Sequence, residues 1–234
     1  MGLLSDRVKS FLRGPRSSAE AGPPANGGGA PQFAQGPARG EALEARHSRG
    51  LDQFFGSFRD QTGLSILDLG GARQENVNFI TSLGHKFYSE DFLRIFQETF
   101  GEDIADQSNP GRIDYFLRRS LEYPDEQFDG VLAWDALEYM EPALLLATAD
   151  RLWRILKPKG YLLAIFHSAE RKQMVPCYNF RVQDARTLQV SRHGERAAAQ
   201  QLFNNRSLEK LFQKFESVKF FLARDRLREV IVRK

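Results

Sequence analysis

The sequence predicts an α/β domain built on a doubly wound, mostly parallel sheet of seven strands that ends in an antiparallel hairpin. From residue 43 onward, short apolar runs alternate with segments of helical period. Glycine- and proline-containing turns separate these segments, and only a short polar connection joins the last two apolar runs. With 234 residues, 41% of them apolar, the chain is long enough for one domain with a substantial core.

Seven apolar runs are expected to form the strands. They cover residues 65–69, 85–89, 113–117, 128–134, 161–166, 217–223 and 229–232. The helices between them are expected at residues 51–58, 76–83, 92–100, 142–156 and 208–215. Gly84 suits the C-cap of the second helix, and Pro142 suits the first turn of the fourth. Ligands of such sheets bind at the carboxyl ends of the strands.

Two segments are expected to precede the domain at 43–234. Residues 1–13 place their apolar side chains on one helical face, which favours a membrane-surface or partner-docking helix, the start of a targeting segment, or a frayed terminus. Residues 14–42 are predicted to be a disordered linker, because positions 14–40 hold 7 Gly, 5 Pro and 6 Ala. No apolar run approaches the ~20 residues of a membrane span.

Charge is unevenly distributed along the chain. Residues 1–40 carry the whole net charge of +3, so a nucleic-acid partner gains little support. Residues 41–169 sum to −8 and residues 170–234 to +8. The two parts either neutralise each other by packing together, or the first holds a cationic ligand while the second meets an anionic one.

Cysteine and histidine are scarce. The single cysteine, Cys177, excludes a disulfide framework and fits a reducing compartment, so we expect a cytoplasmic protein. With four His, one Cys and no paired ligand spacing, we expect no metal site.

The first strand ends in an acidic residue and a glycine turn. Gly70 and Gly71 allow a sharp turn and close approach of the backbone to a ligand, and Asp68 favours a ligand that carries an amine. The dinucleotide fingerprint is not met, because Ala72 and Glu75 occupy later glycine positions. A tight turn without any ligand explains the pattern equally well.

The second strand is followed by two carboxylates. Glu90 lies about 20 residues after the glycine turn, where a carboxylate accepts both ribose hydroxyls of a nucleoside. Asp91 is expected to cap the helix that begins at Phe92.

Residues 64–166 resemble the class I S-adenosylmethionine-dependent methyltransferases, whose fold is Rossmann-like. The resemblance is carried by Phe-Asp at 128–129, the buried strand after it, Trp-Asp at 134–135, Leu-Glu-Tyr at 137–139 and Leu-Lys-Pro-Lys-Gly at 156–160. It departs from the family pattern at Ala72 and Gln74, where glycines are usual, and at Leu117, where an acidic residue is frequent. Tyr139 stands where a histidine is common.

The resemblance implies S-adenosylmethionine as the cofactor and a set of residues that would surround it. The set comprises Asp68, Gly70, Gly71 and Ala72 at the methionine part, Glu90 at the ribose, Leu117 and Arg118 beside the adenine, and Ala133, Trp134 and Asp135 along the cofactor and acceptor cavity. It also implies that residues 168–205, which are basic and look irregular, form a substrate cap.

Acceptor chemistry is expected after the fourth and fifth strands. The candidates are Glu138, Tyr139 and His167, with His167 as a general base where the acceptor is protonated. The function expected is methyl transfer to an unidentified O, N or C nucleophile by in-line displacement. Two alternatives are a non-catalytic binding module of the same fold, tethered through the N-terminal segment, and a nucleotide-dependent oxidoreductase.

Overall fold

The computed structural model describes residues 43–101, 104–167, 174–197, 203–222 and 227–234, which belong to one compact unit, Arg39–Lys234. The N-terminal segment 1–13 and the linker 14–42 lie outside the described residues.

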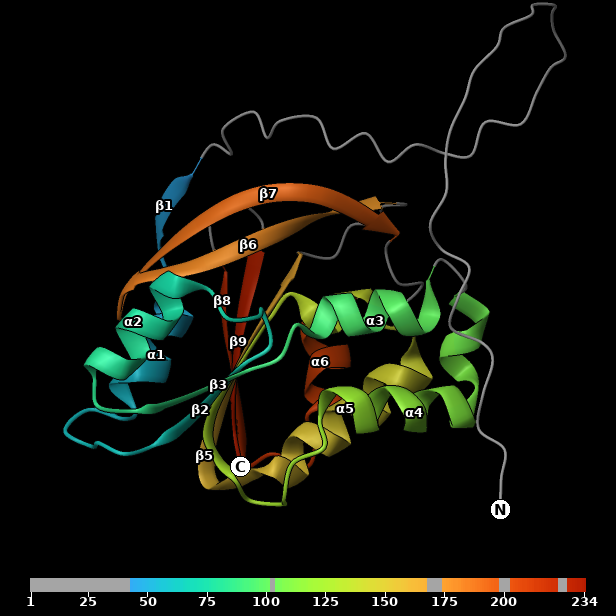
Figure 1. Cartoon of the computed structure of the whole chain (residues 1–234), viewed down its shortest axis with the longest axis horizontal. Helices are drawn as coiled ribbons and strands as arrows, with labels where there is room; N and C mark the ends of the chain where they lie inside the picture. The colour runs from blue at the N-terminus through green and yellow to red at the C-terminus, as the bar shows by residue number, and fades with distance from the viewer. Residues whose placement is uncertain (1–42, 102–103, 168–173, 198–202, 223–226) are drawn as a thin grey trace, which may run out of the picture. The chain divides into compact units, whose positions relative to one another are not determined.

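The main sheet has six strands in the order β3-β2-β4-β5-β9-β8 (Figure 1). The strands are β2 (Ser65–Asp68), β3 (Lys86–Ser89), β4 (Phe128–Trp134), β5 (Leu156–His167), β8 (Ser217–Leu222) and β9 (Leu227–Arg233). The first four strands in this order are parallel, while β9 runs antiparallel to both β5 and β8. The mostly parallel sheet and its antiparallel C-terminal hairpin are therefore confirmed.

Helices cover both faces of this sheet. They are α1 (Arg49–Gly56), α2 (Gln74–Ser82), α3 (Phe92–Phe100), α4 (Pro110–Ser120), α5 (Pro142–Ile155) and α6 (Asn205–Leu211), with short 3-10 helices η1 (Ile104–Ser108) and η2 (Ala136–Tyr139). Successive strand residues point to opposite faces. Ile66 and Leu132 pack with α1 and α2, whereas Leu67 and Val131 pack with α3 to α6.

The expected strand at residues 113–117 is instead part of α4, which is why the sheet has six strands rather than seven. Asn109 caps this helix by accepting hydrogen bonds from the N–H groups of Gly111 and Arg112, and Pro110 occupies its first turn. The buried Phe116 and Ser120 are four residues apart, a helical spacing that the short apolar run concealed.

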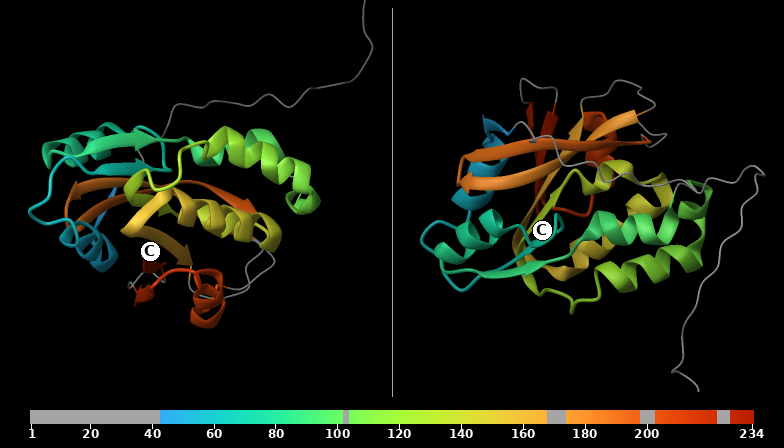
Figure 2. Two further views of the ribbon diagram at one scale, coloured as in Figure 1. Left: turned by 90° about the horizontal axis from the view of Figure 1, so that it is seen from below. Right: turned by 45° about the horizontal axis from the view of Figure 1, so that its top comes forward.

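Residues 168–205 were expected to be irregular, but most of the described part forms a long hairpin. Strand β6 (Met174–Asp184) pairs antiparallel with β7 (Thr187–Ala197), and β7 also pairs with β1 (Glu44–His47). The hairpin arches over the main sheet as a separate layer in Figure 1 and in the right-hand view of Figure 2. Buried side chains alternate along it, from Phe180 and Val182 to Leu188 and Val190, and they join the core shared with α1 and α2.

Gly130 lies in β4 against the ring of Phe54 from α1. A Cβ atom at this position would lie 2.6 Å from Cζ of Phe54 and 2.9 Å from Cδ1 of Ile66. Gly194, also in a strand, has no heavy atom within 4 Å of the equivalent position.

We therefore expect Gly130→Ala to lower the free energy of unfolding by about 1–3 kcal/mol, because the surrounding core must shift to admit one methyl group. Gly194→Ala is the matched control and should change it by less than about 0.5 kcal/mol. Urea denaturation of both variants measures the difference. Equal stability of the two variants would contradict this account of the packing.

Candidate functional site

A cavity of about 210 Å³ lies at the carboxyl ends of the parallel strands, beneath the β6–β7 hairpin. It is lined by Leu69, Gly70, Arg73, Asp91, Leu93, Arg94, Ala133, Trp134, Asp135, Ala136, Tyr178, Asn179, Phe180 and His193. Among the expected site residues, the structure thus brings Gly70, Ala133, Trp134 and Asp135 to one cavity.

Asp68 lies below this cavity and is fully buried. Its Oδ1 accepts hydrogen bonds from Gly70 N–H at 2.8 Å and from the Trp134 indole Nε1–H at 2.6 Å. Its Oδ2 accepts a bond from Asn76 Nδ2 at 2.7 Å. Burial raises the pKa of Asp68 to about 6, although these three donors act in the opposite direction. Through these three hydrogen bonds, Asp68 connects the turn after β2, the end of β4 and the first turn of α2 below the cavity.

The glycine turn is shaped by its neighbours. A Cβ atom on Gly70 would lie 3.0 Å from Cδ1 of Trp134 and 3.1 Å from Oδ1 of Asp68. Gly71 has a φ of 82° and donates its N–H to Glu90 O at 3.0 Å, so this position favours glycine. Ala72 is exposed and does not line the cavity.

Trp134 forms one wall and is the strained residue of the site. Its φ of 50° is rare for a bulky residue, and its side chain is only 2% exposed. The indole stacks on Phe180 of β6, with 5.2 Å between ring centroids and 7° between ring planes. The stack fixes the hairpin over the ends of the strands.

The two carboxylates after β3 have separate environments. Glu90 Oε1 accepts a hydrogen bond from the Tyr123 hydroxyl, and the side chain is not among those lining the cavity. Asp91 lines the cavity and caps α3 by accepting from Arg94 N–H at 3.3 Å, so the predicted cap is confirmed. Burial raises the pKa of Tyr123, and its bond to Glu90 adds to the effect.

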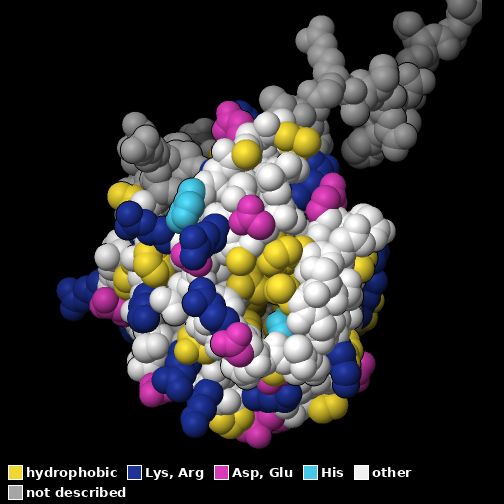
Figure 3. All heavy atoms as spheres, turned by 90° about the vertical axis from the view of Figure 1, so that its left-hand side faces the viewer, with side chains coloured by type: hydrophobic (Ala, Val, Ile, Leu, Met, Phe, Trp, Pro, Cys, Tyr) yellow, Lys and Arg dark blue, Asp and Glu magenta, His cyan; other side chains and the backbone are white. Residues whose placement is uncertain are grey.

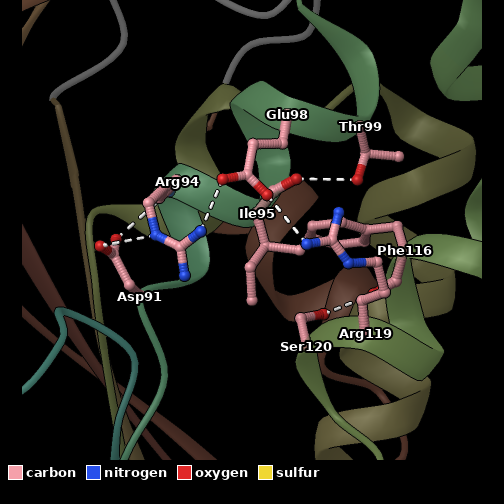
Figure 4. Close-up of polar contacts among 8 residues, drawn as sticks. All are labelled: Asp91, Arg94, Ile95, Glu98, Thr99, Phe116, Arg119 and Ser120. Atoms are coloured by element: carbon pink, nitrogen blue, oxygen red, sulfur yellow. Dashed lines mark hydrogen bonds and ion pairs between the residues drawn. The ribbon is translucent and has the colours of Figure 1, made fainter. Parts of the chain in front are cut away.

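Arg94 belongs to a charged network on the outer side of α3 and α4 (Figure 4). Its guanidinium contacts Asp91 at 3.3 Å and Glu98 at 2.5 Å. Glu98 also contacts Arg119 of α4 at 2.9 Å. The network is exposed, so its contribution is small, and it holds Arg94 beside the cavity mouth.

Leu117 and Arg118 are not brought to the cavity. Both belong to α4, where Leu117 packs against the core and the exposed Arg118 contacts Asp114 at 2.5 Å. The expectation that they flank a strand end was tied to a strand that is in fact a helix.

Asp135 lines the cavity and is 3% exposed. Its Oδ2 accepts hydrogen bonds from the Tyr139 hydroxyl at 2.5 Å and from Tyr178 N–H at 3.3 Å. Burial raises the pKa of Asp135 to about 6. Burial also raises the pKa of Tyr139, so its hydroxyl stays a donor to Asp135.

Glu138 and His167 form a buried pair beside this carboxylate. Glu138 accepts from His167 N–H at 3.0 Å, and its other oxygen lies 2.5 Å from His167 Nδ1. The imidazole stacks on Tyr178 at a centroid distance of 5.8 Å. Its Nε2 is buried and has no hydrogen-bond partner among the described residues. Tyr178 lines the cavity, whereas His167 lies behind it.

Asn76 is a residue of the site's hydrogen-bond network that the sequence analysis did not predict. Its Nδ2 donates to Asp68 and, at 3.3 Å, to Phe180 O, while its Oδ1 accepts from Val182 N–H at 2.7 Å. Arg73 Nη2 likewise donates to Asn179 Oδ1 across the cavity mouth. A signal for Asn76 existed, since it stands four residues before the buried Ile80 on the apolar face of α2.

Neither a candidate metal site nor a candidate membrane-spanning helix is present in the described residues. Within these ranges, no group of three or more His, Cys, Asp or Glu side chains is arranged to hold a metal ion. In the same part of the chain, no helix combines the length and apolar character needed to cross a membrane.

Comparisons with known proteins gave one family match. A family model described as a methyltransferase domain matches residues 40–216. No curated protein matches the sequence.

Several solved structures resemble the chain at low identity. A Burkholderia thailandensis 1,6-didemethyltoxoflavin-N1-methyltransferase with bound 1,6-didemethyltoxoflavin and S-adenosylhomocysteine is 13% identical, with a TM-score of 0.43 over 79% of this chain and 76% of that chain. A SAM-dependent methyltransferase from Archaeoglobus fulgidus is 13% identical, with a TM-score of 0.47 over 79% of this chain and 91% of that one. A Haemonchus contortus phosphoethanolamine N-methyltransferase 2 in complex with S-adenosyl-L-methionine is 12% identical, with a TM-score of 0.46. The match covers 79% of this chain and 52% of that chain.

The two buried carboxyls predict a pH-dependent stability. Asp68 and Asp135 have a pKa of about 6 when folded and near the ordinary 3.8 when unfolded, so the folded state binds more protons between these values. Their contribution to stability is complete below pH 3.8 and is lost as the pH rises through about 6. Asp135→Asn keeps an oxygen for Tyr139 and Tyr178 but does not titrate.

The unfolding free energy should fall between pH 4 and pH 7, and we expect Asp135→Asn to make this fall smaller by about 2 kcal/mol. Urea denaturation at a series of pH values measures this slope. Asp114→Asn, at an exposed carboxylate, is the control and should leave the slope as in the wild type. An unchanged slope in Asp135→Asn would show that this carboxyl does not lose its proton near pH 6.

Proposed function

The chain belongs to the methyltransferase domain family, and from that premise we propose how its cavity residues serve transfer of a methyl group from S-adenosylmethionine to an acceptor. The observation that carries the proposal is the convergence of Gly70, Trp134 and Asp135 on one cavity at the carboxyl ends of the strands. When bound, S-adenosylmethionine supplies an electrophilic methyl group on a sulfonium cation.

The residues present suit such a cofactor. Asp135 lines the cavity with a buried carboxylate that accepts hydrogen bonds from the Tyr139 hydroxyl and the Tyr178 N–H group, so a cation in the cavity would offset its burial. Asp68 adds negative charge from below, while Arg73 and Arg94 stand at the mouth, where they suit a carboxylate. Charges of both signs match a zwitterionic amino acid that also carries a sulfonium.

Most of the predicted cofactor residues have a proposed role. Gly70 and Gly71 let the chain pass close to the methionine part, with Ala72 completing the turn. Glu90 is proposed to accept the ribose hydroxyls through Oε2, since among the described residues no donor reaches that oxygen. We do not propose Leu117 and Arg118 as adenine contacts, because both belong to α4. There Leu117 packs against the core and Arg118 pairs with Asp114.

The chain acts on the reaction mainly by positioning and by excluding water. Phe180 and Tyr178 cover the cavity from the hairpin, and Trp134 closes its wall. Tyr139 fixes the orientation of Asp135 through its hydroxyl. No further chemistry is required from these groups in an in-line displacement.

A proton acceptor is available for acceptors that are protonated. Glu138 Oε2 holds a hydrogen on His167 Nδ1, which leaves the lone pair of the neutral imidazole on Nε2. We propose His167 as the base and Glu138 as the residue that positions it. Because Tyr178 stands between the ring and the cavity, the base works only with Tyr178 turned aside.

The acceptor is proposed to be anionic and the site of action cytoplasmic. Arg73, Arg94 and His193 around the cavity support a negatively charged acceptor. The buried Cys177, the single cysteine of the sequence, forms no disulfide, which supports a reducing compartment.

The proposal is tested by binding of S-adenosylmethionine, measured by isothermal titration calorimetry. Gly70→Ala adds a methyl group that meets Trp134 and Asp68, so we expect affinity to fall at least about tenfold. Gly194→Ala, with open space around it, should bind as the wild type does. Absence of saturable binding by the wild-type chain would overturn the proposal.

The affinity should also rise with pH. The carboxyls of Asp68 and Asp135 lose their protons near pH 6, and the ionised form attracts the cofactor's positive charge. A carboxyl with that pKa is about tenfold more ionised at pH 7 than at pH 5, so we expect affinity to increase by up to about tenfold per coupled carboxyl. Calorimetry at both pH values measures the increase, and Asp135→Asn should reduce it. A pH-independent affinity would contradict the electrostatic role.

A further inference from the structure

A second cavity, of about 430 Å³, lies near the amino end of β3, away from the strand ends that form the first. It is bounded by the end of α1, the loop at 57–62, the end of α2 and the β6–β7 turn. Its lining residues are Asp52, Phe55, Gly56, Phe58, Arg59, Asp60, Gln61, Thr62, Leu83, His85, Ala185 and Arg186, none of which lines the first cavity. Figure 3 turns this side toward the viewer and shows hydrophobic side chains gathered at its centre among charged groups.

The inner wall of this cavity is aromatic. Phe55 and Phe58 are each 6% exposed and belong to a network of edge-to-face rings that includes Phe54, Phe79 and Tyr161. The volume is within the range of about 300–1,000 Å³ typical of small-molecule sites. Rigid aromatic walls of this kind suit a flat aromatic ligand.

His85 supplies a buried polar group to the wall of the cavity. It is 6% exposed, and its ring meets Phe58 at a centroid distance of 6.4 Å. Nδ1 is buried without a hydrogen-bond partner among the described residues. Nε2 has no hydrogen-bond partner among the described residues either, but unlike Nδ1 it is accessible. Nε2 is therefore the ring nitrogen that faces the cavity.

The imidazole is a hydrogen-bond donor toward the cavity. Burial lowers the pKa of His85, against the opposing effect of Asp129, so the ring is neutral at pH 7. Of the two neutral tautomers, the one with hydrogen on Nε2 avoids burying an N–H group that has no acceptor. A ligand oxygen would satisfy Nε2–H.

We propose that this cavity is a second binding site, which takes a small aromatic compound whose hydroxyl oxygen accepts a hydrogen bond from His85 Nε2. The rim supports an uncharged ligand, because Arg59 and Arg186 are offset by Asp52 and Asp60. The site is independent of the methyl-transfer proposal, since the two cavities share no lining residue.

The test uses 2-naphthol as the probe and naphthalene as its matched control without the hydroxyl. Calorimetric titration of the full chain should show saturable binding of 2-naphthol, about tenfold tighter than naphthalene. His85→Phe keeps an aromatic wall without the nitrogen, and we expect it to bring 2-naphthol down to the affinity of naphthalene.

A variant that fills the cavity with a larger side chain gives a second test. Gly56 lines the cavity, and a Cβ atom on it would meet no heavy atom within 4 Å, so the side chain of Gly56→Leu has room to fill the space. We expect this variant to lose binding of both probes at least about tenfold, while Gly194→Leu, away from the cavity, binds as the wild type does. A cooperative urea transition of Gly56→Leu like that of the wild type would show that the variant is folded.

The proposal is overturned if the wild-type chain shows no saturable binding of 2-naphthol, or if Gly56→Leu binds it as tightly as the wild type. Equal affinities of 2-naphthol and naphthalene for the wild-type chain would overturn the role of His85. None of these results bears on whether the first cavity binds S-adenosylmethionine.

Discussion

The carboxylate of Asp68 is the interaction on which the candidate site depends. A charge this deeply buried is costly unless donors surround it, and here Gly70, Asn76 and Trp134 each supply an N–H group. These donors come from the turn after β2, from α2 and from the end of β4. One carboxylate therefore holds the turn after β2 and α2 against the end of β4, 66 residues further along the chain. Removing it would deprive the N–H groups of Gly70, Asn76 and Trp134 of this acceptor, so the cavity and the local fold cannot be altered separately at this position.

The β6–β7 hairpin, which covers the cavity, is held through the same carboxylate of Asp68. Asn76, held by Asp68, uses its remaining groups to bind the backbone of β6 at Phe180 and Val182. Trp134, also held by Asp68, stacks on the ring of Phe180. The hairpin is thus attached by two independent contacts that meet at one carboxylate. The positive φ of Trp134 is sustained by this double attachment, which places backbone strain at the edge of the cavity.

Most of the fold could be predicted because the periodicity of buried residues is clear in long elements. The strand at residues 128–134 and the helix after Pro142 have patterns that fit one structure only. The run at residues 113–117 is too short for periodicity to separate strand from helix, and the deciding contact, the Asn109 cap, lies outside it. In residues 174–197 the alternation is interrupted by irregular register between Cys177 and Tyr178, which disguised a long hairpin as a loop.

The site was predictable only where position in the fold determines it. Gly70, Trp134 and Asp135 end their strands, so any parallel sheet brings them together. Side-chain partners are a different matter, because they depend on which rotamer and which neighbour the packed structure allows. Glu90 was expected to face a ribose, yet Tyr123 from the segment before β4 already holds one of its oxygens. Asn76 and Arg73 act on the hairpin, more than 100 residues further along the chain. A contact between segments so far apart leaves no local pattern in either of them. The sequence therefore predicts the strand-end residues of the cavity far better than the hairpin that covers it.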